Sequence, residues 1–280
     1  MTSTGKHLDP SGPPASFLVE AVARTLAALR FFSRLAVPAF SFERDAFAVP
    51  DLRRIAPYAP IAGAIIGACG AIALWLARAL GLPTLVAAAL ALSVLVLAAG
   101  GLHEDGLADV VDGFGGGATR ERKLEIMRDS RLGAYGGAAL ILSLLLRAAA
   151  LAALTGESLT KSAAALLLAG AISRACSLAP IALLDPARLD GAGASVGRLD
   201  AGAFWRGVLT AFVIAVILGL AFLGLGRALL ALALAWAAAL TMVAVAQKQI
   251  GGQTGDVAGA AQQLAEIACL CGLLIGSVAA

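Results

Sequence analysis

Long apolar stretches, separated by short polar segments, dominate the pattern of this 280-residue chain. A run of about 20 apolar residues is long enough for a helix to cross a membrane. Such runs occur near residues 57–80, 82–101, 133–154, 162–184, 206–224, 228–247 and 263–280. The pattern therefore predicts an all-α fold, a polytopic integral-membrane helical bundle with seven spans.

The N-terminal part of the chain follows a different pattern. Residues 1–16 are polar and rich in Pro, Gly and Ser, which predicts a disordered tail without the apolar core of a signal peptide. Residues 17–37 interleave apolar side chains with Arg24, Arg30 and Arg34. This interleaving predicts an amphipathic helix that lies on the membrane surface. We expect residues 17–280 to form a single membrane-embedded domain.

Charged residues are scarce and unevenly placed. They make up 14% of the chain, against 60% hydrophobic residues. With seven spans and a cytoplasmic N-terminus, the outer loops carry only Arg78, Lys161 and Arg227, while most of the 21 Lys and Arg lie on the inner side. This bias predicts that the polar motifs described below face the cytoplasm. The net charge of +3 is too small to indicate a nucleic-acid partner, and the four cysteines form no zinc or disulfide pattern.

The densest charge lies in LHEDGLADVVDGFGGG, residues 102–117, directly after an apolar stretch. Its carboxylates are those of Glu104, Asp105, Asp109 and Asp112. On a helix the three aspartates share one face, because positions i, i+4 and i+7 fall within about 60° of one another. Like charges on one stripe repel unless a cation lies between them, and oxygen ligands favour Mg²⁺ or Mn²⁺. The alternative is a solvated face or a helix cap. His103 is a further candidate ligand or proton carrier.

A basic segment follows in residues 118–133, ATRERKLEIMRDSRLG. It predicts a short helix along the inner surface. Arg128, Asp129 and Arg131 adjoin the next span, so we expect them to bind phosphate or substrate beside the metal. We interpret the other basic side chains as surface charges; they are Arg120, Arg122 and Lys123.

A glycine-rich segment, GGQTGD at residues 251–256, lies on the same predicted side of the membrane. Backbone amides in such a turn can approach an anion closely. Asp256 is either a further ligand in the site or the N-cap of the last span. Arg147 and Arg174 lie within spans, where an arginine usually faces a polar cavity or a partner carboxylate. Arg174 could reach a buried phosphate, and Glu266 could pair with it.

These motifs resemble one known family. The segments HEDGLADVVDGFGGG, RDSRLGAYG and GGQTGDVAGAAQQLAE occur in the order found in the cobalamin synthase family, the adenosylcobinamide-GDP ribazoletransferases, and AALRFFSRLAVP resembles the N-terminal segment of that family. The resemblance implies a Mg²⁺-dependent transferase of cobalamin biosynthesis in the bacterial inner membrane. Its substrates would be adenosylcobinamide-GDP and α-ribazole or the 5′-phosphate of α-ribazole. A homo-oligomer and association with other cobalamin-assembly enzymes stay open.

The residues suggest how such a reaction runs. Mg²⁺ held by the four carboxylates would bridge the diphosphate of the donor and neutralise charge on the leaving GMP. The 5′-hydroxyl of the ribazole would attack the phosphate attached to cobinamide. Asp105, Asp109 and Asp112 are the candidate catalytic residues, with Asp112 suggested as the group that takes the proton. Arg128, Arg131 and Arg174 would hold phosphate oxygens.

Two other functions compete with this interpretation. A CDP-alcohol phosphotransferase acting on lipid also uses an Asp-rich motif, but Asp109 stands where that family has arginine. A cation transporter would place its acids near mid-membrane, often in repeated halves. The acidic motif here is expected at the cytoplasmic end of a span, and it has no repeat in the second half of the chain.

Overall fold

The computed structural model describes residues 17–43, 45–188 and 198–276, which fold into helices joined by short connections. The first half contains α1 (Phe17–Phe32), α2 (Leu52–Ile55), α3 (Ala59–Ala79), α4 (Thr84–Ala99), α5 (Leu102–Gly116) and α6 (Arg120–Ile126). The second half contains α7 (Ala134–Glu157), α8 (Leu159–Leu183), α10 (Ala201–Leu218), α11 (Leu225–Ile250) and α12 (Gly255–Leu274). A 3₁₀ turn over Ala56–Tyr58 joins α2 to α3, and a π-helical turn over Gly219–Leu223 extends α10. The predicted tail, residues 1–16, lies outside the described residues.

The predicted membrane bundle is confirmed. Six helices, or continuous helix runs, are long and apolar enough to cross a membrane: 52–79, 134–157, 159–183, 201–223, 225–250 and 255–274. The described part of the seventh predicted span begins eight residues earlier than expected, because Thr254 caps α12. Its predicted last residues, 277–280, are not among those described.

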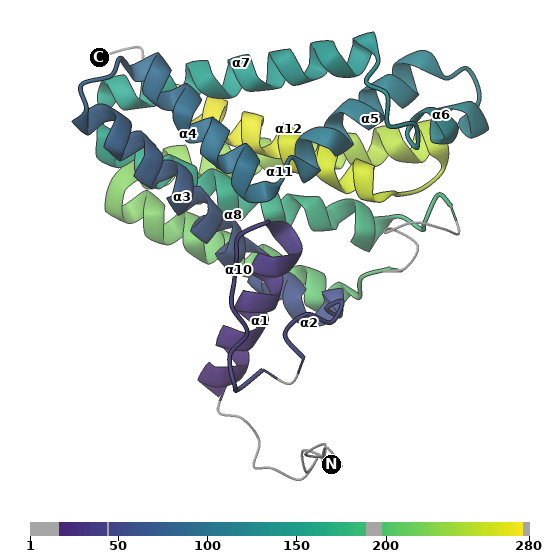
Figure 1. Cartoon of the computed structure of the whole chain (residues 1–280), viewed down its shortest axis with the longest axis horizontal. Coiled ribbons are helices and arrows are strands. Elements are labelled where there is room, and N and C mark those ends of the chain that lie inside the picture. The colour runs from purple at the N-terminus through teal and green to yellow at the C-terminus, as the bar shows by residue number, and fades with distance from the viewer. Residues whose placement is uncertain (1–16, 44, 189–197, 277–280) are drawn as a thin grey trace, which may run out of the picture.

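The second predicted span, residues 82–101, contains α4 (Thr84–Ala99) and ends at a sharp bend. α4 ends at Ala99 after 16 residues, and α5 leaves it at an angle of 89°. Gly100 and Gly101 form the turn, each with a φ of +69°, a backbone conformation that glycine adopts without the steric cost borne by other residues. The acidic motif therefore does not continue a straight span. It forms a separate helix that runs beside α7 and α12 toward α6 (Figure 1).

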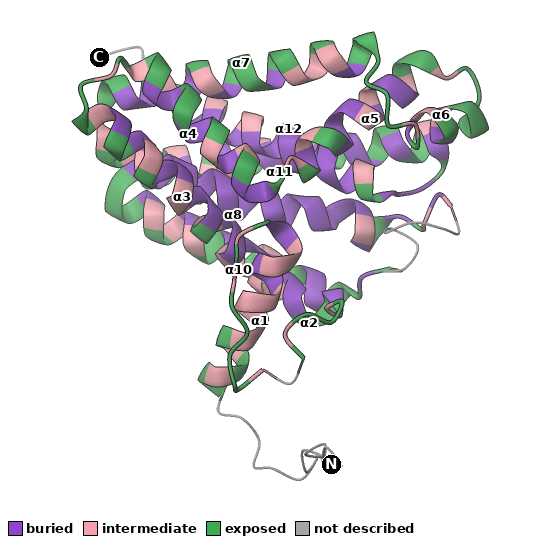
Figure 2. Cartoon of the chain, in the orientation of Figure 1, coloured by how far each residue is buried: buried purple, intermediate pink, exposed green. Residues whose placement is uncertain are grey.

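The centre of the bundle is formed by α8 and α12. Figure 2 shows both as mostly buried, while α7 presents an exposed outer face. The exposed side chains of α7 include Ile141, Leu142 and Leu145, each about 60% exposed. A contiguous apolar surface of this kind is expected to contact lipid rather than water.

The two ends of the bundle differ in their connections. At one end the turns after α7 and before α11 meet, where Arg227 lies 3.4 Å from Glu157. At the other end Arg120 donates hydrogen bonds to the carbonyl oxygens of Ile250 (2.8 Å) and Ala187 (2.5 Å). Arg120 is thus a surface residue, as predicted, that also ties α6 to two polar connections. The basic segment and the glycine-rich segment therefore share one end of the molecule.

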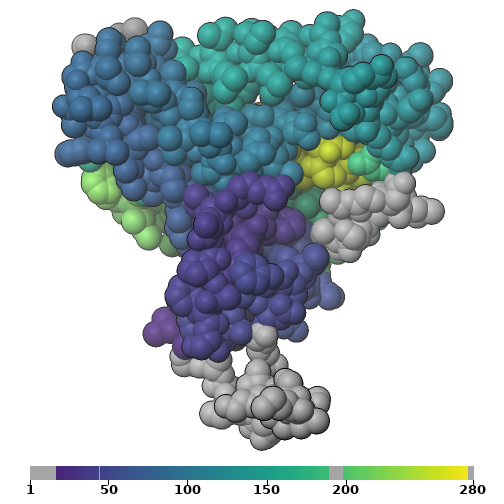
Figure 3. All heavy atoms as spheres, in the orientation of Figure 1, coloured from purple at the N-terminus to yellow at the C-terminus, as the bar shows by residue number. Residues whose placement is uncertain are grey.

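The N-terminal segment forms a block against this bundle (Figures 1 and 3). α1 ends at Phe32, five residues before the predicted boundary, and buries Ala28, Leu29 and Phe32. Arg30 then folds the following segment back onto α1, since its guanidinium contacts Glu43 at 2.5 Å and donates to the Pro38 carbonyl oxygen at 2.5 Å. The location of α1 on a membrane surface stays a prediction.

Candidate active site

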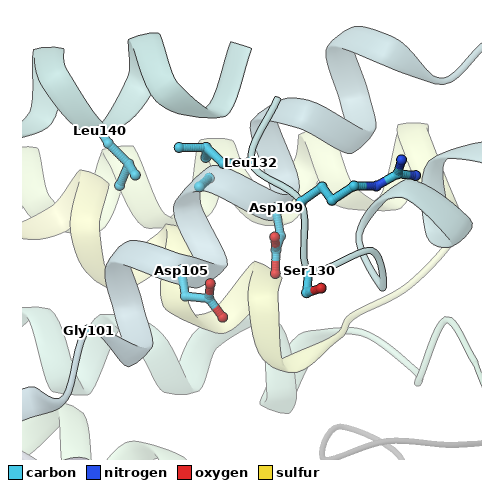
Figure 4. A pocket seen from close by; sticks show the side chains of 8 residues that line it. Gly101, Asp105, Asp109, Ser130, Leu132 and Leu140 are labelled. Atoms are coloured by element: carbon cyan, nitrogen blue, oxygen red, sulfur yellow. The ribbon is translucent and has the colours of Figure 1, made fainter. Parts of the chain in front are cut away.

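Two cavities meet at α5. The smaller one, about 240 Å³, lies between α5 and the segment that leads into α7. Asp105 and Asp109 both line it, together with Ser130 and Arg131. Figure 4 shows the two carboxylates projecting from the same side of α5, as their i, i+4 spacing predicts.

The larger cavity, about 1500 Å³, lies on the other side of the turn before α5. Its wall combines α1, residues 42–43 and 45–54, the start of α5 and the first turn of α12. Asp105 lines this cavity as well, as does Asp256. Among the described residues, Asp105 is therefore the one carboxylate that lines both cavities.

A close helix crossing brings Asp256 to α5. A Cβ atom at Gly106 would come within 2.8 Å of the Asp256 carbonyl oxygen and 3.1 Å of the Asp256 Cα. Only glycine allows the two backbones to approach this closely. The DGLAD and TGDVAG motifs, which are 150 residues apart in sequence, thus form one site.

Asp256 is not the N-cap of α12. Thr254 takes that role, because its hydroxyl oxygen accepts a hydrogen bond from the Val257 amide (3.3 Å). The same hydroxyl donates to Asp256 Oδ2 (3.2 Å), which also lies 3.4 Å from Arg188 Nη2. Of the two predicted roles for Asp256, the structure supports the one in the site.

Arg188 is a candidate site residue that the sequence analysis missed: it lines neither cavity, but it contacts Asp256, which lines the large one. Its side chain is 17% exposed, and its Nη1 is buried with no hydrogen-bond partner among the described residues. A guanidinium beside the site with a free donor is suited to bind a phosphate oxygen. Arg188 sits in a polar connection without a recognisable motif, so only its proximity to Asp256 reveals it.

Glu104 faces away from both cavities, although it adjoins Asp105. Its Oε1 lies 3.2 Å from Arg147 Nη1 and accepts a hydrogen bond from Gln263 (3.0 Å). Arg147 also pairs with Glu266 at 3.1 Å. The expectation that Arg147 meets partner carboxylates is therefore confirmed, and Glu104 belongs to a buried ion-pair network.

Arg174 belongs to the same network. Its Nη1 lies 3.2 Å from Glu266 Oε2, which confirms the expected pairing. Arg174 is 4% exposed and lines neither cavity. The structure therefore does not bring Arg174 to a position where a phosphate could reach it, and the physical reason is that Glu266 already neutralises it inside the bundle.

Asp112 also turns away from the cavities. Its two carboxylate oxygens accept hydrogen bonds from the backbone amides of Gly133 and Gly136, each at 2.8 Å. These amides begin α7, and the first amides of a helix need an acceptor from outside the helix. Asp112 thus caps α7 from a neighbouring helix, and only two members of the predicted aspartate stripe reach a cavity.

Only part of the basic segment, residues 118–133, reaches a cavity. Arg131 lines the small cavity, whereas Arg128 and Asp129 line neither cavity. Hydrogen bonds from Arg131 lower the pKa of Asp129 to about 2, so this carboxylate stays charged and neutralises Arg131. Arg122 pairs with Glu125, and Lys123 donates to Gln249.

His103 lines the large cavity and is buried. Its ring stacks against Phe32 with centroids 6.5 Å apart, and its Nδ1 has no hydrogen-bond partner within the described part of the chain. A role as ligand or proton carrier stays a prediction.

The carboxylates suit a metal that is shared with a substrate. Across the described ranges, no three His, Cys, Asp or Glu side chains are grouped so that they could hold a metal ion by themselves. Mg²⁺ does not require such a cage, since it commonly binds one or two carboxylates, several waters and substrate phosphates. Asp105 and Asp256, on a shared cavity wall, fit that pattern. The predicted four-carboxylate ligand set does not, because amides of α7 occupy both oxygens of Asp112, and Glu104 lines neither cavity and pairs with Arg147 through Oε1.

Comparison with known proteins identifies the family. The model of the cobalamin-5-phosphate synthase family matches residues 24–274. The chain belongs to this family. A protein of Azorhizobium caulinodans named adenosylcobinamide-GDP ribazoletransferase is 54% identical over 249 residues, covering 89% of this chain and 94% of that protein. A protein of Xanthobacter autotrophicus with the same name is 49% identical over 251 residues, covering 89% of this chain and 95% of that protein. No solved structure matches this fold.

The resemblance to the cobalamin synthase family is thereby confirmed. The matched residues include Asp105, Asp109 and Asp256 at the cavities and all four members of the buried ion-pair network: Glu104, Arg147, Arg174 and Glu266. The break between α4 and α5, the crossing at Gly106 and the cap on α7 are thus features of a member of the cobalamin-5-phosphate synthase family.

Proposed function

We propose that this protein transfers the adenosylcobinamide phosphate group of adenosylcobinamide-GDP to α-ribazole or the 5′-phosphate of α-ribazole. GMP leaves, and adenosylcobalamin or its 5′-phosphate forms. The names of the relatives support these substrates. The structural observation that carries the proposal is the place of Asp105 on the walls of two cavities, as a reaction between two bound substrates requires.

The chemistry is displacement at phosphorus. The 5′-hydroxyl oxygen of the ribazole forms a bond to the phosphorus attached to cobinamide, and the bond from that phosphorus to the GMP oxygen breaks. A carboxylate oxygen of Asp109, in the small cavity, accepts the hydroxyl proton. Asp109 replaces Asp112 in this role, because amides of α7 occupy both oxygens of Asp112.

Residues around Asp256 compensate the negative charge of the donor diphosphate. Arg188 donates to oxygens of the donor diphosphate from its Nη1, which has no hydrogen-bond partner among the residues that the structure describes. Asp105 and Asp256 are the residues that would hold Mg²⁺. When bound, Mg²⁺ neutralises charge that develops on the leaving GMP. The protein contribution is to orient both substrates at Asp105 and so to lower the entropic cost of their encounter.

We further propose that the site faces the cytoplasm of a bacterial inner membrane. The support is the charge distribution: the basic and glycine-rich segments gather at the end of the bundle bridged by Arg120. Positively charged segments near membrane spans favour the cytoplasmic side. Self-association or binding to other cobalamin-assembly enzymes remains a prediction.

A transfer assay tests the proposed function. Purified protein in lipid nanodiscs is mixed with adenosylcobinamide-GDP, α-ribazole and Mg²⁺, with or without EDTA. We expect GMP and the cobalamin product in equal amounts, and we expect EDTA to abolish both. A protein that uses a CDP-lipid donor instead, or that carries cations without releasing GMP, would contradict the proposal.

A further inference from the structure

The large cavity exceeds what a nucleotide or a ribazole requires. Its volume of about 1500 Å³ is greater than the roughly 300–1000 Å³ of ordinary small-molecule pockets. Of the proposed substrates, only the donor contains a macrocycle, the corrin ring. Size alone therefore distinguishes the corrinoid end of the donor from its GDP end and from the acceptor.

The wall of this cavity suits the surface chemistry of a corrinoid. A corrin ring has broad apolar faces and a rim of amide groups. Aromatic side chains line the cavity, namely Phe31, Phe32, Phe42 and Phe47. Charged side chains stand among them, including Arg24, Asp45, Asp51 and Arg54. Apolar walls with a few placed polar groups are the usual composition of a cofactor-sized site.

The N-terminal part of the wall is held in place by one arginine. Arg30 contacts Glu43 at 2.5 Å and lies over the ring of Phe47, 5.4 Å from its centroid. The backbone amide of Arg34 donates to the Ala98 carbonyl oxygen (2.7 Å), which joins this wall to the end of α4. The wall is therefore attached to the same turn that sets the direction of α5 and of Asp105.

We propose that the large cavity binds the corrinoid moiety of the donor, with α1 and residues 42–43 and 45–54 as its outer wall, while the acceptor approaches Asp105 from the small cavity. This inference rests on the proposed function and assigns each substrate to a side of the site. With the corrinoid in the large cavity, the diphosphate lies toward Asp105 and Asp256. A lipid chain in the cavity is the competing occupant.

Binding of adenosylcobinamide without GDP tests the assignment. Its affinity for protein in nanodiscs is measured by equilibrium dialysis and corrinoid absorbance. Ala23 lines the large cavity, and Ala21, on the same helix, does not. We expect Ala23→Trp to weaken adenosylcobinamide binding at least fivefold and Ala21→Trp to change it less than twofold. GDP binding and the KM for α-ribazole should stay within twofold in both variants.

A second pair of variants keeps the test decisive if the tryptophan variants do not fold. Phe47 and Phe17 are similarly exposed, at 76% and 79%, but only Phe47 lines the cavity. Phe47→Ala should weaken adenosylcobinamide binding at least threefold, and Phe17→Ala should leave it unchanged. Equal affinities across both pairs, with wild-type GMP release intact, would overturn the assignment and favour a lipid-filled cavity. Absence of GMP release from the wild type would instead overturn the proposed function.

Discussion

Arg147 Nη1 lies 3.2 Å from Glu104 Oε1, one residue before the carboxylate that both cavities share. Arg147 is 1% exposed and also pairs with Glu266. Glu266 in turn pairs with Arg174, so two arginines neutralise two glutamates inside the bundle. This network joins α5, α7, α8 and α12 behind Asp105.

Removing one member should therefore destabilise the fold. Arg147→Met leaves Glu104 and Glu266 with a single arginine, and breaking a buried pair in this way costs about 3–5 kcal/mol. We expect the thermal midpoint in detergent to fall by about 10 °C. The matched control is Arg206→Met at an exposed position, which should shift the midpoint by less than about 2 °C. Equal midpoints for the two variants would contradict a structural role for the network.

The sequence shows which residues carry carboxylate or guanidinium groups, but it does not show in which direction these side chains point. Glu104 and Asp105 are neighbours with the same functional group, yet one lies in the buried network and the other in the cavities. The helical spacing correctly places Asp105 and Asp109 on one face. It cannot reveal that Asp112 meets amides 21 and 24 residues further along, since that contact depends on how α7 packs.

The fold, like the site, could be predicted from the sequence only in part. Apolar runs predict the spans well, because a length near 20 residues is a strong signal. The turn at Gly100 and Gly101 was overlooked because both residues lie at the junction of an apolar run and the acidic motif. The role of the N-terminal segment as a cavity wall was not predicted at all. It depends on long-range contacts such as Arg30 with Glu43, which carry no local pattern.

Asp112 should behave as a cap rather than as a metal ligand. In Asp112→Asn only one side-chain oxygen remains to accept from Gly133 and Gly136, and a buried amide without a partner costs about 1–3 kcal/mol. We expect a lower thermal midpoint, with at least a tenth of wild-type transfer in assays below that midpoint. Complete loss of transfer with an unchanged midpoint would show that Asp112 is part of the reaction centre.

The crossing at Gly106 should be intolerant of even one methyl group. In Gly106→Ala the new Cβ would lie 2.8 Å from the Asp256 carbonyl oxygen, so α5 and α12 must separate. We expect transfer to fall at least tenfold as Asp256 moves away from Asp105. Gly137→Ala provides the control, because its Cβ would meet only Leu132 Cδ2, at 3.8 Å. Wild-type activity in Gly106→Ala would contradict the shared site.

The outer wall of the large cavity should loosen in acid. A hydrogen bond from Arg30 lowers the pKa of Glu43 below its ordinary value of 4.5. A lowered pKa in the folded state stabilises the wall above about pH 4.5, and this contribution declines as the pH falls through the lowered pKa. Amide-exchange protection of residues 38–50 should therefore decrease below pH 4.5. Glu43→Gln should show lower protection at pH 7 and a weaker pH dependence, and an unaltered pH profile in this variant would exclude Glu43 as the cause.

The most direct test of the account is transfer by Asp105→Asn. Asp105 lines both cavities, so its loss should lower GMP release by at least a thousandfold while the thermal midpoint stays within about 2 °C of the wild type. Asp129→Asn is the matched control, because Asp129 lines neither cavity and should retain at least half of the activity. Near-normal GMP release from Asp105→Asn would contradict the claim that the reaction occurs where the two cavities meet.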